Sequence, residues 1–266
     1  MKDPGLRYPA GTDLTPRKDV PSAEWHLTYA CDLDCIACNR ASFLRKPHTP
    51  DMTLADAEDF IRQARALNWE PIITIIGGEP TVHKDFLGFV ELAYNFAGSR
   101  VRVFSNGHRQ IARDLCDQVS RKYGTTIMTE SFKPDTVKAV TGFAGWVDDI
   151  FISPHDFGEP LRIPCFSHCS IMCGISVDSV GYAPCAMGGM VDALLGTERR
   201  TKVLADLFDK EKVAETSAIH CAQCGHRTPR EWPDQKAAHQ AKVDKCETKF
   251  GVPMSPTWIK AFEGRR

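Results

Sequence analysis

Apolar residues alternate between two spacings over residues 22–156. Short apolar runs, each typical of a buried strand, occupy 24–30, 71–76, 101–105, 125–130 and 148–153. The segments between them carry apolar residues at helical spacing over 53–67, 84–96 and 111–123, and a further short helix is expected to begin at Pro134. Repeated strand–helix units predict an α/β fold with a parallel sheet and right-handed crossovers.

Two of these helices carry more specific signals. The sequence Thr53-Leu-Ala-Asp resembles a capping box, in which Thr53 and Asp56 bond each other's backbone at the start of a helix. The helix over 111–123 is expected to end near Gly124. Its Cys116 lies on the apolar face, which predicts a thiol packed in the core as a small hydrophobic residue.

The pattern changes after Asp156. Residues 157–230 are rich in cysteine, glycine and proline, with a hairpin-like segment at 174–185 and one helix around 202–212. The last residues are charged and are expected to be partly helical. These changes predict a core over 20–157, a smaller cysteine-dependent module over 158–230 and a C-terminal segment over 231–266.

Composition narrows the functional classes. Hydrophobic residues make up 42% of the 266 residues, which suffices for a substantial core and excludes a disordered chain. The net charge of −1 gives no basic field, so nucleic acid is not an expected partner. No apolar run approaches the roughly 20 residues of a membrane-spanning helix. The N-terminal residues have no hydrophobic segment of a secretory signal, and the expected location is therefore cytoplasmic.

The chain contains eleven cysteines. Because the cytoplasm keeps thiols reduced, a disulfide framework is not expected. Clustered thiols in a reducing compartment are instead typical of metal sites. Nine of the eleven gather in three groups, with Cys246 later in the chain: Cys31, Cys35 and Cys38; Cys165, Cys169, Cys173 and Cys185; and Cys221 and Cys224.

Polar and metal-binding residues follow the predicted strands at their ends. Folds with parallel strands place their sites in the loops at the carboxyl ends of those strands. A site is therefore expected at that edge of the sheet, formed by Cys31, by 77–80, by 105–107, by Glu130 and Ser131, and by 153–156.

Cys31, Cys35 and Cys38 have the spacing C-x3-C-x2-C. Three thiolates cannot ligate all four irons of a [4Fe–4S] cluster, so one iron would have no protein ligand. An open metal position is a property of catalytic sites, whereas structural sites are closed. The alternative is a structural zinc site, which usually shows paired C-x2-C or Cys/His ligands.

Gly77-Gly78-Glu79-Pro80 ends the second predicted strand. Glycines let the backbone approach a ligand closely and adopt positive φ. Glu79 can accept hydrogen bonds from an ammonium group, and Pro80 stiffens the turn. These four residues alone could form an ordinary strand-ending turn, but the two motifs in this order are far more specific.

With these two motifs the sequence resembles the radical S-adenosylmethionine (SAM) superfamily, over roughly residues 22–156. The resemblance implies a partial (β/α) barrel with the [4Fe–4S] cluster near its top. SAM would chelate the open iron, with Gly77, Gly78 and Glu79 around its amino end. An electron from a low-potential donor such as flavodoxin or ferredoxin would split SAM into methionine and a 5′-deoxyadenosyl radical. That radical would remove a hydrogen atom from the substrate.

The family usually has an aromatic residue before the third cysteine, where it packs on the adenine of SAM. Ala37 stands there instead, so the stacking surface must come from elsewhere or be absent. Ser105 and Asn106 resemble residues found near SAM in some relatives, although Asn106-Gly107 is also a strong turn signal. Glu130 and Ser131 occupy the analogous strand end and are further candidates for SAM contact.

The later cysteines resemble the twitch or SPASM module of many radical SAM enzymes. The resemblance implies one auxiliary [4Fe–4S] cluster, although two clusters, or a zinc ribbon, remain alternatives. Cys165 also suits the family spacing to Gly181. The expected ligands are Cys185, Cys221, Cys224 and either Cys169 or Cys173.

The leading hypothesis is an oxidoreductase or modifying enzyme that acts on a small molecule or peptide, for example by dehydrogenating an aminoglycoside alcohol. His155 follows the fifth predicted strand and is a candidate acid/base group, or a loop histidine paired with a carboxylate. The alternatives are a maturase of ribosomally synthesised peptides and a non-enzymatic iron–sulfur electron carrier. A carrier needs neither an open iron nor the loop over 77–80.

Overall fold

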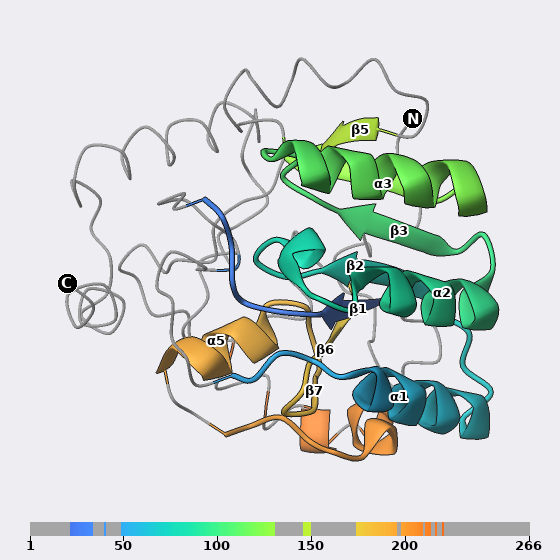
Figure 1. Ribbon diagram of the computed structural model, residues 1–266. Coiled ribbons are helices and arrows are strands. Elements are labelled where there is room, and N and C mark those ends of the chain that lie inside the picture. The colour runs from blue at the N-terminus through green and yellow to red at the C-terminus, as the bar shows by residue number, and fades with distance from the viewer. Residues whose placement is uncertain are drawn as a thin grey trace, which may run out of the picture.

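Seven strands form one sheet in the computed structural model, which describes residues 22–33, 40, 49–130, 146–149, 174–195, 198–209, 211–213, 216 and 220. Their order is β5-β4-β3-β2-β1-β6-β7 (Figure 1). Neighbouring strands are parallel except for β7, which is antiparallel to β6. The strands are β1 (Ser22–His26), β2 (Ile72–Ile76), β3 (Val101–Phe104), β4 (Thr126–Glu130), β5 (Trp146–Asp149), β6 (Ile175–Val177) and β7 (Tyr182–Ala183).

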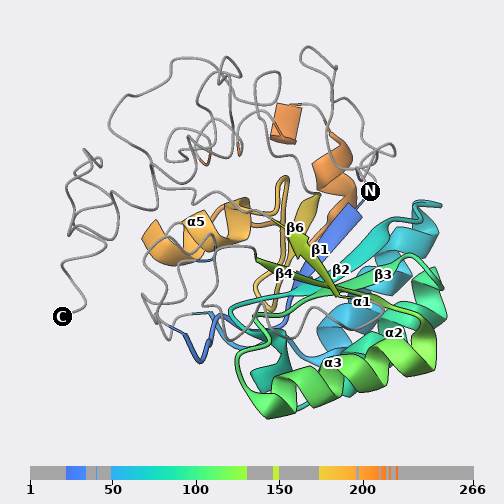
Figure 2. The same ribbon diagram turned by 90° about the horizontal axis from the view of Figure 1, so that it is seen from above.

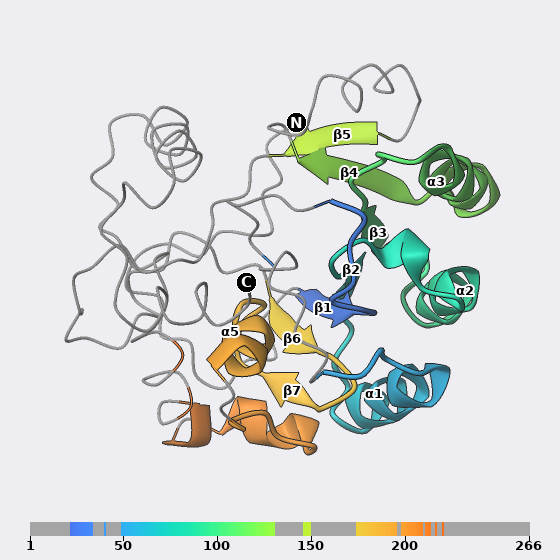
Figure 3. The ribbon, with the colours of Figure 1, turned by 60° about the vertical axis from the view of Figure 1, so that its left-hand side comes forward.

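Three helices cover one face of this sheet and a fourth covers the other. Figures 2 and 3 show α1 (Leu54–Ala66), α2 (Phe86–Ala97) and α3 (Gln110–Tyr123) on one side of the strands, and α5 (Gly188–Leu195) on the opposite side. Strands β1 to β4 alternate with α1 to α3 along the chain, and β1 to β5 are neighbours in the same order. The prediction of an α/β fold with a parallel sheet is confirmed.

The helix-covered face is apolar. Trp25 of β1 packs edge-on against Phe60 of α1 and Phe89 of α2, with ring centroids 5.7 and 6.4 Å apart. Thr53 forms the predicted capping box with Asp56 at the start of α1. The ring contacts fix α1 and α2 to the sheet, because apolar side chains of both elements leave water together.

The opposite face, here called the inner face, is partly charged. Side chains alternate across a strand, so the residues of β1 that do not face the helices lie here, among them Glu24 and His26. The sheet register places Glu24 beside Ser176 and Thr74, and Thr74 beside Arg102. Further along, Ile76, Phe104 and Met128 form a small apolar cluster.

The helix α3 confirms two predictions. It ends at Gly124, whose φ of 66° is the left-handed conformation that glycine adopts without strain. Cys116 is fully buried in the core. Burial raises the pKa of the Cys116 thiol, which is consistent with a packing role.

Some predicted boundaries were wrong. The strand expected at 24–30 is β1 and ends at His26, and the strand expected at 148–153 is β5 and begins two residues earlier, at Trp146. The helix expected around 202–212 is interrupted: the 3-10 helix η4 (Leu204–Phe208) ends where Asp209 takes an extended conformation, and residues 211–213 are α-helical. The helix expected from Pro134 and the segment 231–266 lie outside the described residues.

The predicted hairpin at 174–185 is confirmed as β6 and β7. It does not stand apart, because β6 pairs in parallel with β1 and extends the main sheet. The helix α5, which follows the hairpin, was not predicted. The division of the chain at 157/158 stays a prediction. Among the described helices, none has the length and apolar character needed to cross a membrane.

Candidate functional site

The two motif loops are joined through their backbones beyond the ends of β1 and β2. The amide of Gly78 donates to the carbonyl oxygen of Thr28 at 2.7 Å, and the amide of Glu79 donates to that of Ala30 at 2.9 Å. This pairing leads the chain directly to Cys31. The segment that carries the first cysteine therefore runs beside the glycine loop.

This close approach explains the two glycines. A Cβ added at Gly77 would stand 2.3 Å from the carbonyl oxygen of Thr28, and one added at Gly78 would stand 2.1 Å from that of Ala30. Neither glycine has positive φ, so that expectation was wrong. The glycines are required because two backbones pass each other here without room for a side chain.

Glu79 links the loop after β2 to the loop after β3. Its side chain is fully buried, and one carboxylate oxygen accepts hydrogen bonds from the Thr81 amide at 3.1 Å, the Thr81 hydroxyl at 2.6 Å and the Ser105 hydroxyl at 2.9 Å. The other oxygen accepts from the amide of Asn106 at 2.6 Å. Pro80 begins the short 3-10 helix η2 (Pro80–Val82), with Glu79 as its N-cap.

Opposing effects act on the ionisation of Glu79. Burial raises the pKa of the carboxyl, while the hydrogen bonds from Thr81, Asn106 and Ser105 lower it. With four donors directed at it, the carboxylate serves first to fix the two loops. The predicted contact between Glu79 and the ammonium group of SAM stays a prediction.

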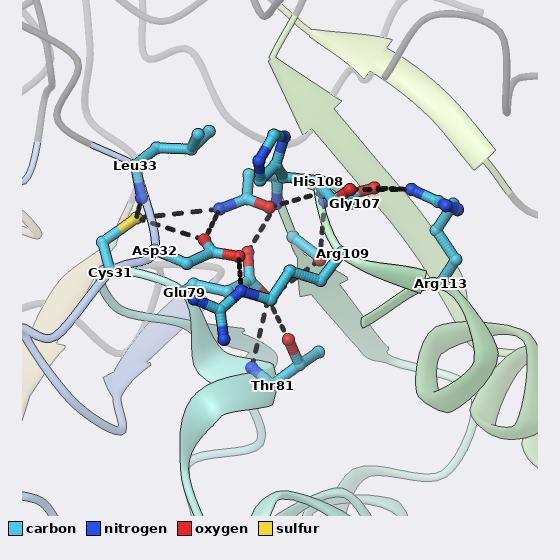
Figure 4. A network of polar contacts seen from close by, with 11 residues as sticks. Cys31, Asp32, Leu33, Glu79, Thr81, Gly107, His108, Arg109 and Arg113 are labelled. Atoms are coloured by element: carbon cyan, nitrogen blue, oxygen red, sulfur yellow. Dashed lines mark hydrogen bonds and ion pairs between the residues drawn. The ribbon is translucent and has the colours of Figure 1, made fainter. Parts of the chain in front are cut away.

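Asn106 connects the loop after β3 to the first cysteine. Figure 4 shows the network of polar contacts around Cys31, Asp32 and Glu79. Its side-chain nitrogen donates to the Asp32 carboxylate at 2.6 Å and lies 3.7 Å from the Cys31 sulfur. Its side-chain oxygen accepts the amide of His108 at 2.7 Å, which fixes the orientation of the carboxamide. Asn106 thus forms the turn that the Asn106-Gly107 pair indicates, and its side chain also lies at the candidate site.

The Cys31 sulfur has an environment suited to an iron–sulfur ligand. The amide of Leu33 donates to it at 3.4 Å, and the thiol remains partly exposed. Hydrogen bonds to cysteine sulfur stabilise the thiolate and tune a bound cluster. Asp32 also pairs with Arg109, whose Nε lies 3.2 Å from the carboxylate and whose side chain is 62% exposed. Asp32 and Arg109 were not predicted, because Asp32 occupies a variable position of the cysteine motif and Arg109 belongs to no motif.

The structure brings together Cys31, Gly77, Gly78, Glu79, Pro80, Ser105 and Asn106 at the carboxyl edge of the sheet. Glu130 ends β4, as expected, at the same edge. Cys185 lies in the turn that follows β7 and is partly exposed. The other candidates lie outside the described residues: Cys35, Cys38, Ser131, His155, Cys169, Cys173, Cys221 and Cys224.

Comparison with known proteins decides the family. Residues 25–141 match the model of the Radical SAM superfamily, a segment that includes all three motif loops of this site. Over this segment the chain carries a radical SAM domain. The predicted family is confirmed, while the twitch or SPASM module stays a prediction.

The curated relatives of this radical SAM protein are enzymes, which confirms the prediction that the protein is an enzyme. One is an S-adenosylmethionine-dependent nucleotide dehydratase of Selenomonas ruminantium, 28% identical over 117 residues that cover 43% of this chain and 41% of the dehydratase. Another is the mycofactocin maturase MftC of Mycolicibacterium smegmatis, 36% identical over 69 residues that cover 26% and 17% of the two chains. The matches thus span less than half the length of these relatives.

A solved structure supports the fold. The crystal structure of BtrN in complex with AdoMet and 2-DOIA is similar with a TM-score of 0.54 and 17% identity, and the match covers 77% of this chain and 87% of BtrN. At this identity the likeness concerns the fold alone. The predicted radical SAM type of α/β fold is confirmed.

Proposed function

We propose that this radical SAM protein holds a [4Fe–4S] cluster on Cys31, Cys35 and Cys38 and removes a hydrogen atom from a small molecule or peptide. Cluster and SAM together supply the 5′-deoxyadenosyl radical when a low-potential donor delivers an electron. The name of the dehydratase relative supports the use of SAM. The remaining roles belong to residues of this chain.

The observation that carries the proposal is the position of Asn106. Its side chain reaches Asp32 and the Cys31 sulfur, and its backbone amide bonds Glu79. One residue thereby ties the cysteine loop to the glycine loop. Such a link holds a cluster ligand and the predicted SAM-binding backbone at a fixed separation before any ligand arrives, which lowers the ordering cost of binding.

The predicted auxiliary cluster is part of the proposal. Cys185 would ligate it together with Cys221, Cys224 and either Cys169 or Cys173. The partly exposed Cys185 follows a hairpin of the main sheet, so its position relative to the first site is fixed by strands. An auxiliary cluster there would accept an electron from the substrate radical or help to bind the substrate, with His155 as a candidate acid/base group.

The decisive experiment measures 5′-deoxyadenosine formed from SAM by anaerobically reconstituted, reduced protein. A variant with Cys31, Cys35 and Cys38 all replaced by alanine is the control. Formation by the wild type alone would support the proposal. If the wild type carries a full complement of iron and still forms no 5′-deoxyadenosine, the proposed activity is wrong.

Two substrate classes fit the proposal. The name of the maturase relative favours a peptide, although that match covers only the core. Binding to a precursor peptide encoded nearby, followed by deuterium transfer from labelled peptide into 5′-deoxyadenosine, would establish this class. If the reaction is instead an alcohol dehydrogenation, product should form without a second SAM-derived reductant, and loss of the auxiliary ligands should abolish it.

A further inference from the structure

A buried ion pair lies on the inner face beside the first cysteine loop. Arg40, two residues after Cys38, donates to the Glu24 carboxylate of β1 at 2.7 Å, and both side chains are only 2% exposed. Its second terminal nitrogen donates to the carbonyl oxygen of Ala186 at 3.2 Å. The guanidinium group therefore joins β1, the segment after Cys38 and the residue after Cys185.

The residues around Ala186 form a tight turn into α5. The amide of Gly188 donates to the carbonyl oxygen of Cys185 at 2.9 Å, and Cys185 packs against Ala186 and Met187. A bond to the Ala186 carbonyl therefore fixes the backbone that carries the Cys185 thiol.

The helix α5 also holds His220, which precedes Cys221. The His220 ring contacts the Asp192 carboxylate of α5 at 2.8 Å, and a Cβ added at Gly188 would stand 2.7 Å from the same ring. One helix thus bonds the backbone of one predicted auxiliary ligand, Cys185, and contacts the residue next to another, Cys221. Gly188 is required because the imidazole occupies the space of a side chain.

Further buried charges fix α5 to the sheet. Arg200 pairs with Asp178, which follows β6, and its Nε lies 3.7 Å from Asp192. Gly189 lies against Ser176 of β6, where an added Cβ would stand 2.5 Å from the hydroxyl oxygen. Because a buried charge left without its partner is costly, these pairs hold one arrangement.

We propose that Arg40 is a positioning residue that sets the auxiliary cluster site relative to the first cluster, with α5 as the element it positions. Ordering of the first cysteine loop by its cluster then also orders the turn that carries Cys185. This inference rests on the auxiliary cluster of the proposed function. It goes beyond that function by assigning the connection between the two sites to Arg40, Ala186 and α5.

Two single substitutions test the connection. Arg40→Lys keeps the positive charge beside Glu24, but a single ammonium group does not reproduce the two-armed guanidinium contact with Glu24 and Ala186. Gly188→Ala leaves Arg40 intact and displaces His220. The matched controls are Arg100→Lys at an exposed ion pair with Glu70, and Gly88→Ala in α2, where an added Cβ would meet only the Leu54 side chain at 3.3 Å.

The measurement is iron and acid-labile sulfide per chain, together with electron paramagnetic resonance spectra of the reduced holoenzyme with and without SAM. A wild type with two [4Fe–4S] clusters carries about eight irons per chain. We expect both variants to lose about half of this iron and to keep the spectrum of the first cluster with its response to SAM. Both controls should match the wild type.

Any other pattern overturns the inference, including retention of the second cluster by either variant or loss of both clusters together. Failure of the proposed function looks different. A wild type with about four irons per chain that still forms 5′-deoxyadenosine would show that the proposed auxiliary cluster is absent. This inference would then be wrong, while the proposed cleavage of SAM would stand. A wild type with both clusters that forms no 5′-deoxyadenosine would show instead that the proposed activity is wrong. The iron content of the variants would still test the positioning role of Arg40.

Discussion

The carbonyl oxygen of Ala30 occupies the space that a side chain at position 78 would fill. A Cβ on Gly78 would stand 2.1 Å from this oxygen, and the amide of the next residue, Glu79, donates to it. The cysteine loop and the glycine loop are therefore one packed unit in which neither backbone can move away without losing hydrogen bonds.

Gly78→Ala should destabilise the fold itself. The added methyl group must separate two backbones, and overpacking of this kind costs about 1–3 kcal/mol or more. Urea unfolding followed by circular dichroism measures the effect. Gly88→Ala is the matched control, because its site is roomier and alanine favours the helix. Equal stability of the two variants would show that Gly78 is needed only for a bound ligand.

Glu79→Gln tests whether the carboxylate serves the fold or SAM. Its two oxygens accept from Thr81, Ser105 and Asn106, and an amide nitrogen would face a donor at one of these places. We expect a loss of about 1–3 kcal/mol in the free energy of unfolding without SAM present. Calorimetry of the SAM-free protein measures this loss. Unchanged stability with weakened SAM binding would instead assign the carboxylate to SAM.

The sequence predicted the parts of the fold that local patterns determine. The strands β2, β3 and β4 coincide with apolar runs, and Thr53 and Gly124 mark helix ends by their own chemistry. The boundary of β1 failed because residues 27–30 continue the apolar run, although the strand itself ends at His26. Beyond it the backbone pairs instead with the loop after β2, where Gly78 and Glu79 donate to Thr28 and Ala30.

Long-range polar pairing could not be predicted. Arg40 contacts Ala186 across 146 positions, and nothing near either residue indicates the partner. The helix α5 was missed because it begins with Gly188 and Gly189, which disfavour a helix and are present here because His220 and Ser176 lie against them. At the candidate site, the sequence predicted the motif residues but not Asp32 and Arg109.

Asn106→Ala should weaken the first cluster and SAM binding with little change in the fold. The substitution removes the hydrogen bond to Asp32, the contact with Cys31 and the acceptor for His108, while the backbone bond to Glu79 remains. Hydrogen bonds to charged groups are worth about 1.5–3 kcal/mol, so SAM affinity should fall about 10- to 100-fold.

Equilibrium SAM binding to reconstituted protein checks this expectation, with iron content measured on the same sample. Glu70→Gln, on the exposed side of the Arg100 ion pair, is the control and should bind SAM as the wild type does. Unaltered SAM affinity in Asn106→Ala would contradict the role of this residue as the link between the loops.

Cys116 should resist alkylation in the folded protein while Cys31 reacts. The Cys116 side chain is fully buried, and burial raises the pKa of its thiol, so the reactive thiolate is scarce. Cys31 is partly exposed. Iodoacetamide treatment of iron-free protein at pH 8, followed by peptide mass spectrometry, gives the extent for each thiol. Rapid labelling of Cys116 before unfolding would mean that α3 does not pack as described.

His26 should make stability depend on pH in the weakly acidic range. Its ring is buried on the inner face, and burial lowers its pKa well below 6.5, with a further contribution from the charges of Arg40 and Arg200. As pH falls below 6.5, the unfolded chain gains a proton that the folded chain does not, so the unfolded state is favoured. The loss should continue until the lower folded-state pKa is reached.

The expected slope from this one group is at most about 1.4 kcal/mol per pH unit. Urea unfolding at pH 7.5 and at 5.5 measures it in the wild type and in His26→Gln, which cannot titrate. The wild type should lose more stability between the two pH values than the variant does, because the remaining titrating groups are shared. Equal losses in both proteins would show that His26 is protonated in the fold, paired with Glu24, whose carboxylate lies 3.7 Å away.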